Sequence, residues 1–136
     1  MDGIIFDVDG TLWDSVEVVA ESWNLAIKEN SDLEPNLNRE ILQGLFGKTM
    51  DEIAAGVFPD LDTDSRRKLM DICFDYENRY LETHPGVYYE GVMDTLKELA
   101  LEYPLFIVSN CQCGYIEVMM KGAGMEPYIK DFLCFG

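Results

Sequence analysis

The chain has 136 residues, of which 48% are hydrophobic and 26% are charged, a globular composition that excludes disordered, collagen-like and coiled-coil chains. Ten basic residues against 26 acidic ones give a net charge of −16, which argues against nucleic acid as a partner, because phosphate backbones are bound mainly by clustered Lys and Arg. The sequence contains no apolar run of the ~18 residues that a membrane helix needs, and its start does not resemble a signal peptide. We therefore expect a soluble, cytoplasmic protein with neither a nucleic-acid nor a membrane partner.

Three short apolar runs predict β-strands. The first begins at Gly3 and is stopped by Asp7, Asp9 and Gly10, the second covers residues 104–108, and the third covers residues 132–135. Apolar residues occupy consecutive rather than alternate positions in each run, which favours a parallel sheet with helices on both faces. An α/β fold is predicted.

Helical periodicity fills the sequence between these runs. Residues 92–103 and 115–120 predict helices beside the second strand, the latter closed by glycines at 122 and 124. Further helices are expected from Asp14, which with Glu17 resembles a capping box, and at residues 39–45, 50–57 and about 64–81. Residues 14–87 are thus predicted to form an inserted α-helical cap, and residues 1–13 and 88–136 the α/β core. The expected buried positions of the first and the longest cap helix are Val16, Val19, Ala20, Trp23, Ile27, Leu69, Ile72, Cys73, Tyr76 and Tyr80.

Two carboxylates mark the end of the first strand. Asp7 and Asp9 are two residues apart, so their side chains share a side, and open α/β sheets bind ligands at the carboxyl ends of their strands. One acid can stay ionised as nucleophile or metal ligand, while the other serves as general acid and then base. An ordinary Asp-Gly turn is the alternative, whereas a calcium loop is excluded by Thr11, Leu12 and Val18.

Two segments resemble signature motifs of a known superfamily. Residues 5–15, IFDVDGTLWDS, closely resemble the first motif of the haloacid dehalogenase superfamily, especially its phosphoglycolate-phosphatase-like branch. Residues 106–110, FIVSN, are similar to the second motif, and the helical insert between them resembles that family's α-helical cap. The resemblance implies a Rossmann-like parallel sheet with an inserted cap.

The resemblance also implies phosphoryl transfer through a covalent aspartyl-phosphate. Asp7 would attack phosphorus, and Asp9 would protonate the leaving oxygen and then activate water. Mg²⁺ would be held by the Asp7 carboxylate and the Asp9 backbone carbonyl. Thr11 and Ser109 would hydrogen-bond the phosphoryl oxygens, with help from Asn110. The expected substrate is a small phosphorylated metabolite.

The cap would set specificity by closing over the phosphate. Lys48 lies in a loop that resembles the family's substrate-facing cap loop, where it would meet a carboxylate or hydroxyl of the substrate. A solvated loop lysine is the competing interpretation. Cys111 and Cys113 are interpreted as ordinary small residues of a reducing cytosol rather than as a metal or redox site. The other two cysteines of the sequence are Cys73 and Cys134.

The sequence departs from the family pattern at its end. The third and fourth motifs, which carry a phosphate-binding lysine and further metal-binding carboxylates, are absent, so we expect a fragment with little or no activity of its own. Without later strands the first strand would expose an edge, which invites self-association. Two alternatives stay open: a sugar phosphomutase of the same superfamily, and a noncatalytic relative that binds phosphate or protein.

Overall fold

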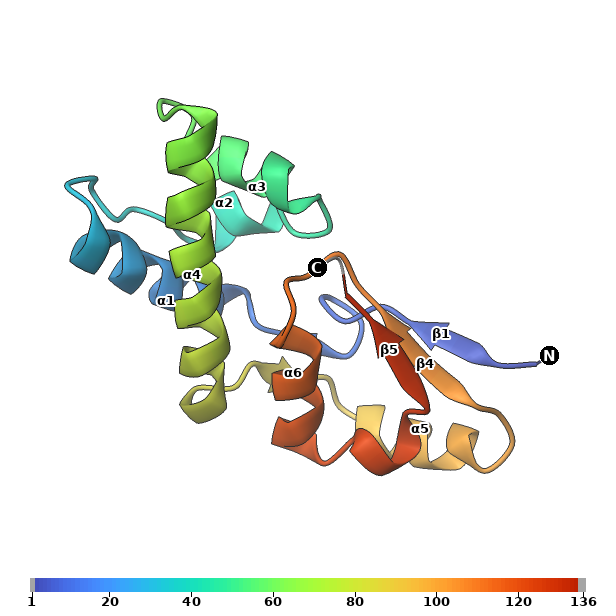
Figure 1. Ribbon diagram of the computed structural model, residues 1–136. Helices are drawn as coiled ribbons and strands as arrows, with labels where there is room; N and C mark the ends of the chain where they lie inside the picture. The colour runs from blue at the N-terminus through green and yellow to red at the C-terminus, as the bar shows by residue number, and fades with distance from the viewer. Residues whose placement is uncertain (1, 135–136) are drawn as a thin grey trace.

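A computed structural model describes residues 2–134 and contains a parallel sheet beside a group of helices (Figure 1). The sheet consists of β1 (Ile4–Phe6), β4 (Leu105–Val108) and β5 (Asp131–Leu133), hydrogen-bonded in the order β1-β4-β5. The predicted α/β class and the three predicted strands are confirmed. Strand β5 begins one residue earlier than the third apolar run, and Phe135 of that run lies outside the described residues.

Two helices accompany the sheet. Helix α5 (Val92–Ala100) precedes β4, and α6 (Tyr115–Ala123) connects β4 to β5, followed by a short 3-10 helix, η1 (Glu126–Tyr128). Helix α6 ends at Gly124, whose φ of 70° is left-handed and whose N–H donates to the carbonyls of Lys121 and Met120. This is the glycine cap that the sequence predicts. Helix α5 is shorter than the predicted residues 92–103.

Helices cover only one face of the described sheet, which corrects the expectation of two covered faces. Strand register places Ile4, Leu105 and Phe132 on the face that packs against α5 and α6. On the opposite face Ile5, Val108 and Leu133 are 69%, 43% and 65% exposed. The reason is topological: the chain steps from β1 to β4 to β5 in one direction, and right-handed crossovers in one direction put their helices on one side.

A small antiparallel ribbon, which the sequence did not predict, joins the sheet to the cap helices. It pairs β2 (Trp13–Asp14) with β3 (Val87–Tyr88), so the segments by which the chain leaves and re-enters the sheet region lie side by side. Gly86 allows this approach, because a Cβ atom there would lie 2.9 Å from the Asp14 carbonyl oxygen and 2.9 Å from the Trp13 ring.

The cap helices are α1 (Val16–Asn30), α2 (Arg39–Gln43), α3 (Met50–Val57) and α4 (Thr63–Thr83), and α1 packs against α4 (Figure 1). They share a hydrophobic cluster separate from that of the sheet. The boundary residues assigned to the cap and the core stay a prediction. Among the helices of residues 2–134, none is long and apolar enough to cross a membrane.

The start of α1 differs in detail from the predicted capping box. The N-cap residue is Ser15, whose side chain makes no capping hydrogen bond, and the Asp14 carboxylate accepts from the N–H of Val16 at 3.1 Å. The other carboxylate oxygen of Asp14 pairs with Arg39 of α2 at 3.0 Å. The predicted buried positions of α1 are confirmed.

The buried stripe of α4 is rotated from the predicted one. Tyr76 and Tyr80 were expected to be buried, but they are half-exposed and their hydroxyls donate to Glu29 at 2.5 Å and Glu21 at 3.1 Å on α1. Tyrosine commonly occupies such a boundary, because its ring packs while its hydroxyl stays polar. Ile72 is also half-buried. The buried residues of α4 are Leu69, Met70, Cys73, Phe74, Glu77 and Leu81.

Candidate active site

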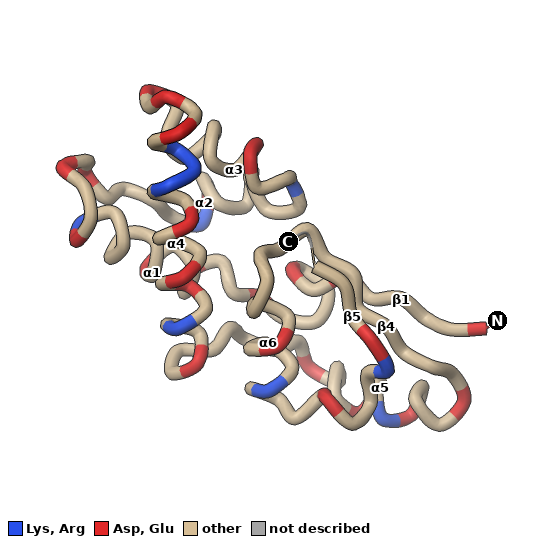
Figure 2. The backbone as a smooth tube through the Cα atoms, in the orientation of Figure 1, with Lys and Arg blue, Asp and Glu red and all other residues tan. Residues whose placement is uncertain are grey.

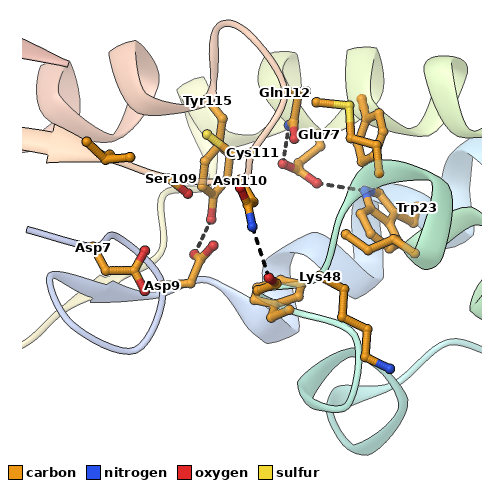
Figure 3. Close-up of a pocket in the computed structure, with 16 residues that line it drawn as sticks. Asp7, Asp9, Trp23, Lys48, Glu77, Ser109, Asn110, Cys111, Gln112 and Tyr115 are labelled. Carbon is orange, nitrogen blue, oxygen red and sulfur yellow. Dashed lines mark hydrogen bonds between the residues drawn. The ribbon is translucent and has the colours of Figure 1, made fainter. Parts of the chain in front are cut away.

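A cavity of about 360 Å³ lies between the cap helices and the carboxyl ends of β1 and β4 (Figure 3). Asp7 follows β1 and Ser109 follows β4, and these strands are parallel neighbours in the sheet. Carboxyl ends of adjacent parallel strands meet at the same edge, which is where open α/β sheets bind ligands. The cap supplies the opposite wall, which includes Trp23 of α1 and Phe74 of α4.

Five of the residues singled out in the sequence line this cavity: Asp7, Asp9, Lys48, Ser109 and Asn110. The structure therefore brings together residues from both sequence motifs and from the α2–α3 loop. Their chemical roles stay a prediction.

Thr11 lies apart from this group. It is exposed in the turn after β1, where its backbone N–H donates to the Val8 carbonyl at 3.1 Å, and it is not among the residues that line the cavity. Gly10 gives the same turn its left-handed φ of 76°. The predicted contact of Thr11 with a phosphoryl group stays a prediction.

Asp9 is held by a buried tyrosine. The Tyr115 hydroxyl donates to Asp9 Oδ1 at 2.5 Å, and Ser15 Oγ lies 2.7 Å from the same hydroxyl and 3.4 Å from Oδ1. Trp13 Nε1 donates to the Tyr115 hydroxyl at 3.2 Å. Figure 3 shows the Asp9 carboxylate turned toward Tyr115. The orientation of Asp9 is therefore fixed by Ser15 and Tyr115, which are 100 residues apart in the sequence.

Burial raises the pKa of Asp9 to about 6. Desolvation is the largest cause, the hydrogen bond from Tyr115 opposes it, and the nearby negative charge of Asp7 adds to the rise. A carboxyl group with a pKa near neutrality exchanges its proton readily at physiological pH. The surroundings of Asp9 thus suit a proton carrier.

A second carboxyl group, Glu77 of α4, lies buried in the wall of the cavity. Trp23 Nε1 donates to Glu77 Oε1 at 2.8 Å, and the Gln112 amide donates to Oε2 (Figure 3). The side chain is 3% exposed, and burial raises its pKa to about 8, against the opposing effect of the Gln112 hydrogen bond. Because Glu77 belongs to the cap and Gln112 to the β4–α6 loop, this hydrogen bond connects the two walls of the site.

The β4–α6 loop makes further contacts with the cap. Asn110 Nδ2 donates to the Gly47 carbonyl at 3.2 Å, and Asn78 Nδ2 donates to the Cys113 carbonyl at 2.8 Å. Lys48, next to Gly47, is exposed, and in Figure 3 its ammonium group points away from Asp7 and Asp9. The contact of Lys48 with a substrate stays a prediction.

The charge around the cavity is predominantly negative. The carboxyl groups of Asp7, Asp9 and Glu77 line it together with one cation, Lys48. Because burial raises the pKa of Glu77 to about 8, the negative charge at neutral pH comes from Asp7 and Asp9. Acidic residues also outnumber basic ones over the rest of the chain (Figure 2). An anionic substrate would meet repulsion here unless a cation accompanied it.

The oxygen donors present are compatible with Mg²⁺. Asp7 contributes a carboxylate and Asp9 a backbone carbonyl, both of the hard oxygen type that Mg²⁺ prefers. The described residues contain no group of three or more His, Cys, Asp or Glu side chains able to hold a metal. This donor set still fits Mg²⁺, which usually keeps several waters and binds through one or two carboxylates and substrate phosphates.

Sequence reasoning missed Glu77, Gln112 and the polar role of Tyr115. A signal for Glu77 was present, because it occupies the i+4 position from Cys73 and the i+3 position from Phe74, on the apolar stripe of α4. A carboxyl group on such a stripe indicates a buried, hydrogen-bonded acid. Tyr115 was expected only as an apolar helix residue, and Gln112 carried no recognisable signal.

The parallel sheet, its helices and the carboxylates at the strand ends define an α/β core of the type expected from the motifs. A family model described as haloacid dehalogenase-like hydrolase matches residues 4–135. The chain therefore belongs to the haloacid dehalogenase-like hydrolase family. Among curated proteins, no match is found.

Solved structures share this fold. A predicted phosphoglycolate phosphatase from Haemophilus somnus superposes with a TM-score of 0.85 at 22% identity, over 99% of this chain and 63% of that chain. The haloacid dehalogenase-like hydrolase SP0104 from Streptococcus pneumoniae superposes with a TM-score of 0.78 at 21% identity, over 98% of this chain and 61% of that chain. A predicted phosphatase from Clostridium acetobutylicum superposes with a TM-score of 0.72 at 17% identity, over 98% of this chain and 60% of that chain. The chain thus spans about three-fifths of the length of these structures.

Proposed function

We propose that this chain is part of a Mg²⁺-dependent phosphatase that hydrolyses a small phosphorylated metabolite through an aspartyl-phosphate. The observation that carries the proposal is the juxtaposition of Asp7 and Asp9 with Ser109 in one cavity under the cap helices. Family membership and the fold shared with two predicted phosphatases support it.

In the proposed reaction Asp7 supplies the nucleophile. One of its carboxylate oxygens forms a bond to phosphorus while the bond from phosphorus to the leaving oxygen breaks, and Asp9 transfers its proton to that oxygen. Asp9, now ionised, then takes a proton from water as the water oxygen attacks phosphorus and the bond to Asp7 breaks. Inorganic phosphate leaves, and both carboxyl groups return to their starting states.

The remaining cavity residues have positioning roles in this proposal. The Ser109 hydroxyl and the Asn110 amide would donate to oxygens of the transferring group, and Tyr115 holds Asp9 in place. Mg²⁺, bound to the Asp7 carboxylate and the Asp9 carbonyl, would supply positive charge that offsets repulsion between the carboxylate and the phosphate. The presence of an acid at position 9 favours ester cleavage, because a leaving alkoxide needs a proton.

The proposal extends to the whole protein rather than to residues 1–136 alone. Because the chain spans about three-fifths of the length of similar structures, we expect weak turnover from it by itself. The cytoplasmic location expected from the sequence stays a prediction.

A test that needs no turnover is to trap the covalent intermediate. The Asp9→Asn variant keeps the nucleophile but lacks the base for hydrolysis, so incubation with p-nitrophenyl phosphate and Mg²⁺ should leave a phosphoryl group on Asp7, detected by intact mass and peptide mapping. Turnover should fall by a factor of about 10²–10⁴. Asp131→Asn, at an exposed position on β5, serves as the matched control and should behave like the unaltered chain.

The Asp7→Asn variant should give no phosphoryl adduct. If the phosphoryl group is found on a residue other than Asp7, or if the adduct forms equally on the Asp7→Asn chain, the proposed mechanism is wrong.

A further inference from the structure

Three cysteines gather at the carboxyl edge of the sheet. Cys111 and Cys113 lie in the loop after β4, and Cys134 directly follows β5. The Sγ atoms of Cys113 and Cys134 are 3.0 Å apart, although the residues are separated by 21 positions. Cys113 is exposed and Cys134 is half-buried, so reagents in solution reach the pair.

Sheet pairing explains why these two thiols meet. Val108 is paired with Leu133 in the β4–β5 ladder, and the N–H of Ser109 donates to the Leu133 carbonyl at 3.0 Å. The two chain segments therefore leave the sheet side by side. Cys113 is held from the other direction by its carbonyl, which accepts from Asn78 Nδ2 at 2.8 Å. The backbone contacts thus place the thiols next to each other without a disulfide.

We propose that Cys113 and Cys134 form a redox modification site that closes to a disulfide when the protein meets a hydroperoxide. With hydrogen peroxide as oxidant, one thiolate attacks a peroxide oxygen and the O–O bond breaks, so that a sulfenic acid forms and hydroxide leaves. The hydroxide takes up the proton that the thiol had released and becomes water. The second thiol then attacks the sulfenic sulfur and releases a second water as the S–S bond forms. The two sulfurs together lose two electrons, which the peroxide gains.

The other cysteines are poorly suited to this chemistry. Cys73 is fully buried in the cap cluster, and burial raises the pKa of its thiol to about 12. Burial likewise raises the pKa of Cys111 to about 12. The pKa of Cys113 is raised as well, chiefly because its thiol shares a hydrogen bond with Cys134. Oxidation should therefore be selective for the exposed pair and faster at alkaline pH, where more thiolate is present.

The disulfide would affect the loop that contacts the cap. Residues 109–114 carry Ser109 and Asn110 at the cavity, and Gln112 donates to Glu77 and Asn78 of α4. A bond from Cys113 to Cys134 would tie this loop to the end of β5. It would also cross-link a segment of the unfolded chain, which raises the Tm of the oxidised form.

The experiment maps cysteines after oxidation of the chain with limiting hydrogen peroxide at pH 8. Free thiols are blocked with N-ethylmaleimide under denaturing conditions, and tryptic peptides are analysed without reduction. Trypsin places Cys113 in peptide 98–121 and Cys134 in the peptide that begins at Asp131, so the disulfide appears as a cross-link between them. We expect this cross-link, its loss on addition of dithiothreitol, and a higher Tm for the oxidised chain.

Single substitutions identify the partners. The Cys113→Ser and Cys134→Ser chains should lose the cross-link, while Cys111→Ser and the buried control Cys73→Ser should keep it. A cross-link that joins Cys111 to Cys134 and persists in the Cys113→Ser chain would overturn the proposal. So would full labelling of all thiols after oxidation, or a product linked only between two chains on a non-reducing gel. The cross-link mapping and the thermal unfolding do not depend on phosphatase activity.

Discussion

Replacing Glu77 by glutamine should remove most of the pH dependence of stability between pH 6 and 8. In the folded chain burial raises the pKa of Glu77 from 4.5 to about 8. Between these values the folded state holds a proton that the unfolded state has released, so the free energy of unfolding falls as the pH rises. A single such group gives a slope of about 1.4 kcal/mol per pH unit, or about 2–3 kcal/mol between pH 6 and 8.

The range from pH 6 to 8 separates the contribution of Glu77 to stability from that of Asp9. The pKa of Asp9 is also raised, from 3.8 to about 6, so its contribution has the same sign and acts mainly below pH 6. Glu77 is 3% exposed, so solvent screening does not reduce its effect appreciably. The expected loss of stability above pH 6 therefore belongs chiefly to Glu77.

The assay is urea unfolding at pH 6, 7 and 8, followed by tryptophan fluorescence and circular dichroism. The unaltered chain should lose stability across this series, and the Glu77→Gln chain should be nearly flat. Glu82→Gln, at an exposed position on the same helix, is the matched control and should keep the original slope. Equal slopes for the unaltered and Glu77→Gln chains would show that Glu77 is ionised in the folded protein and would refute the reasoning.

Two further substitutions test the site and the sheet. Tyr115→Phe removes the hydroxyl that donates to Asp9 and leaves the Trp13 indole N–H without its acceptor. We therefore expect a loss of about 2–3 kcal/mol in the free energy of unfolding. We also expect a further rise in the pKa of Asp9, measured by NMR titration. An unchanged pKa of Asp9 would contradict the assigned hydrogen bond. Residues 1–136 should self-associate through the β1 edge and the exposed face of the sheet, and Ile5→Lys combined with Leu133→Lys should reduce that association in sedimentation velocity. A chain that is monomeric at all concentrations before substitution would argue against this surface.

Local sequence patterns were sufficient for much of the fold. The apolar runs predicted β1, β4 and β5 to within one residue where the structure describes them, and helical periodicity predicted α3 at Met50–Val57. Such patterns are contained in windows of a few residues, because side-chain direction repeats every two residues in a strand and every 3.6 in a helix. The spacing of Asp7 and Asp9 after an apolar strand is equally local, and this explains why the candidate site was recognisable.

Tertiary structure alone decided the features that depend on distant partners. The β2–β3 ribbon has two residues in each strand and no pattern long enough to predict it. Tyr115 reaches Asp9 across 106 positions of the sequence, and Cys113 meets Cys134 only because β4 and β5 are neighbours. The raised pKa of Glu77 likewise depends on how completely packing excludes water from it, and no short stretch of sequence specifies that exclusion.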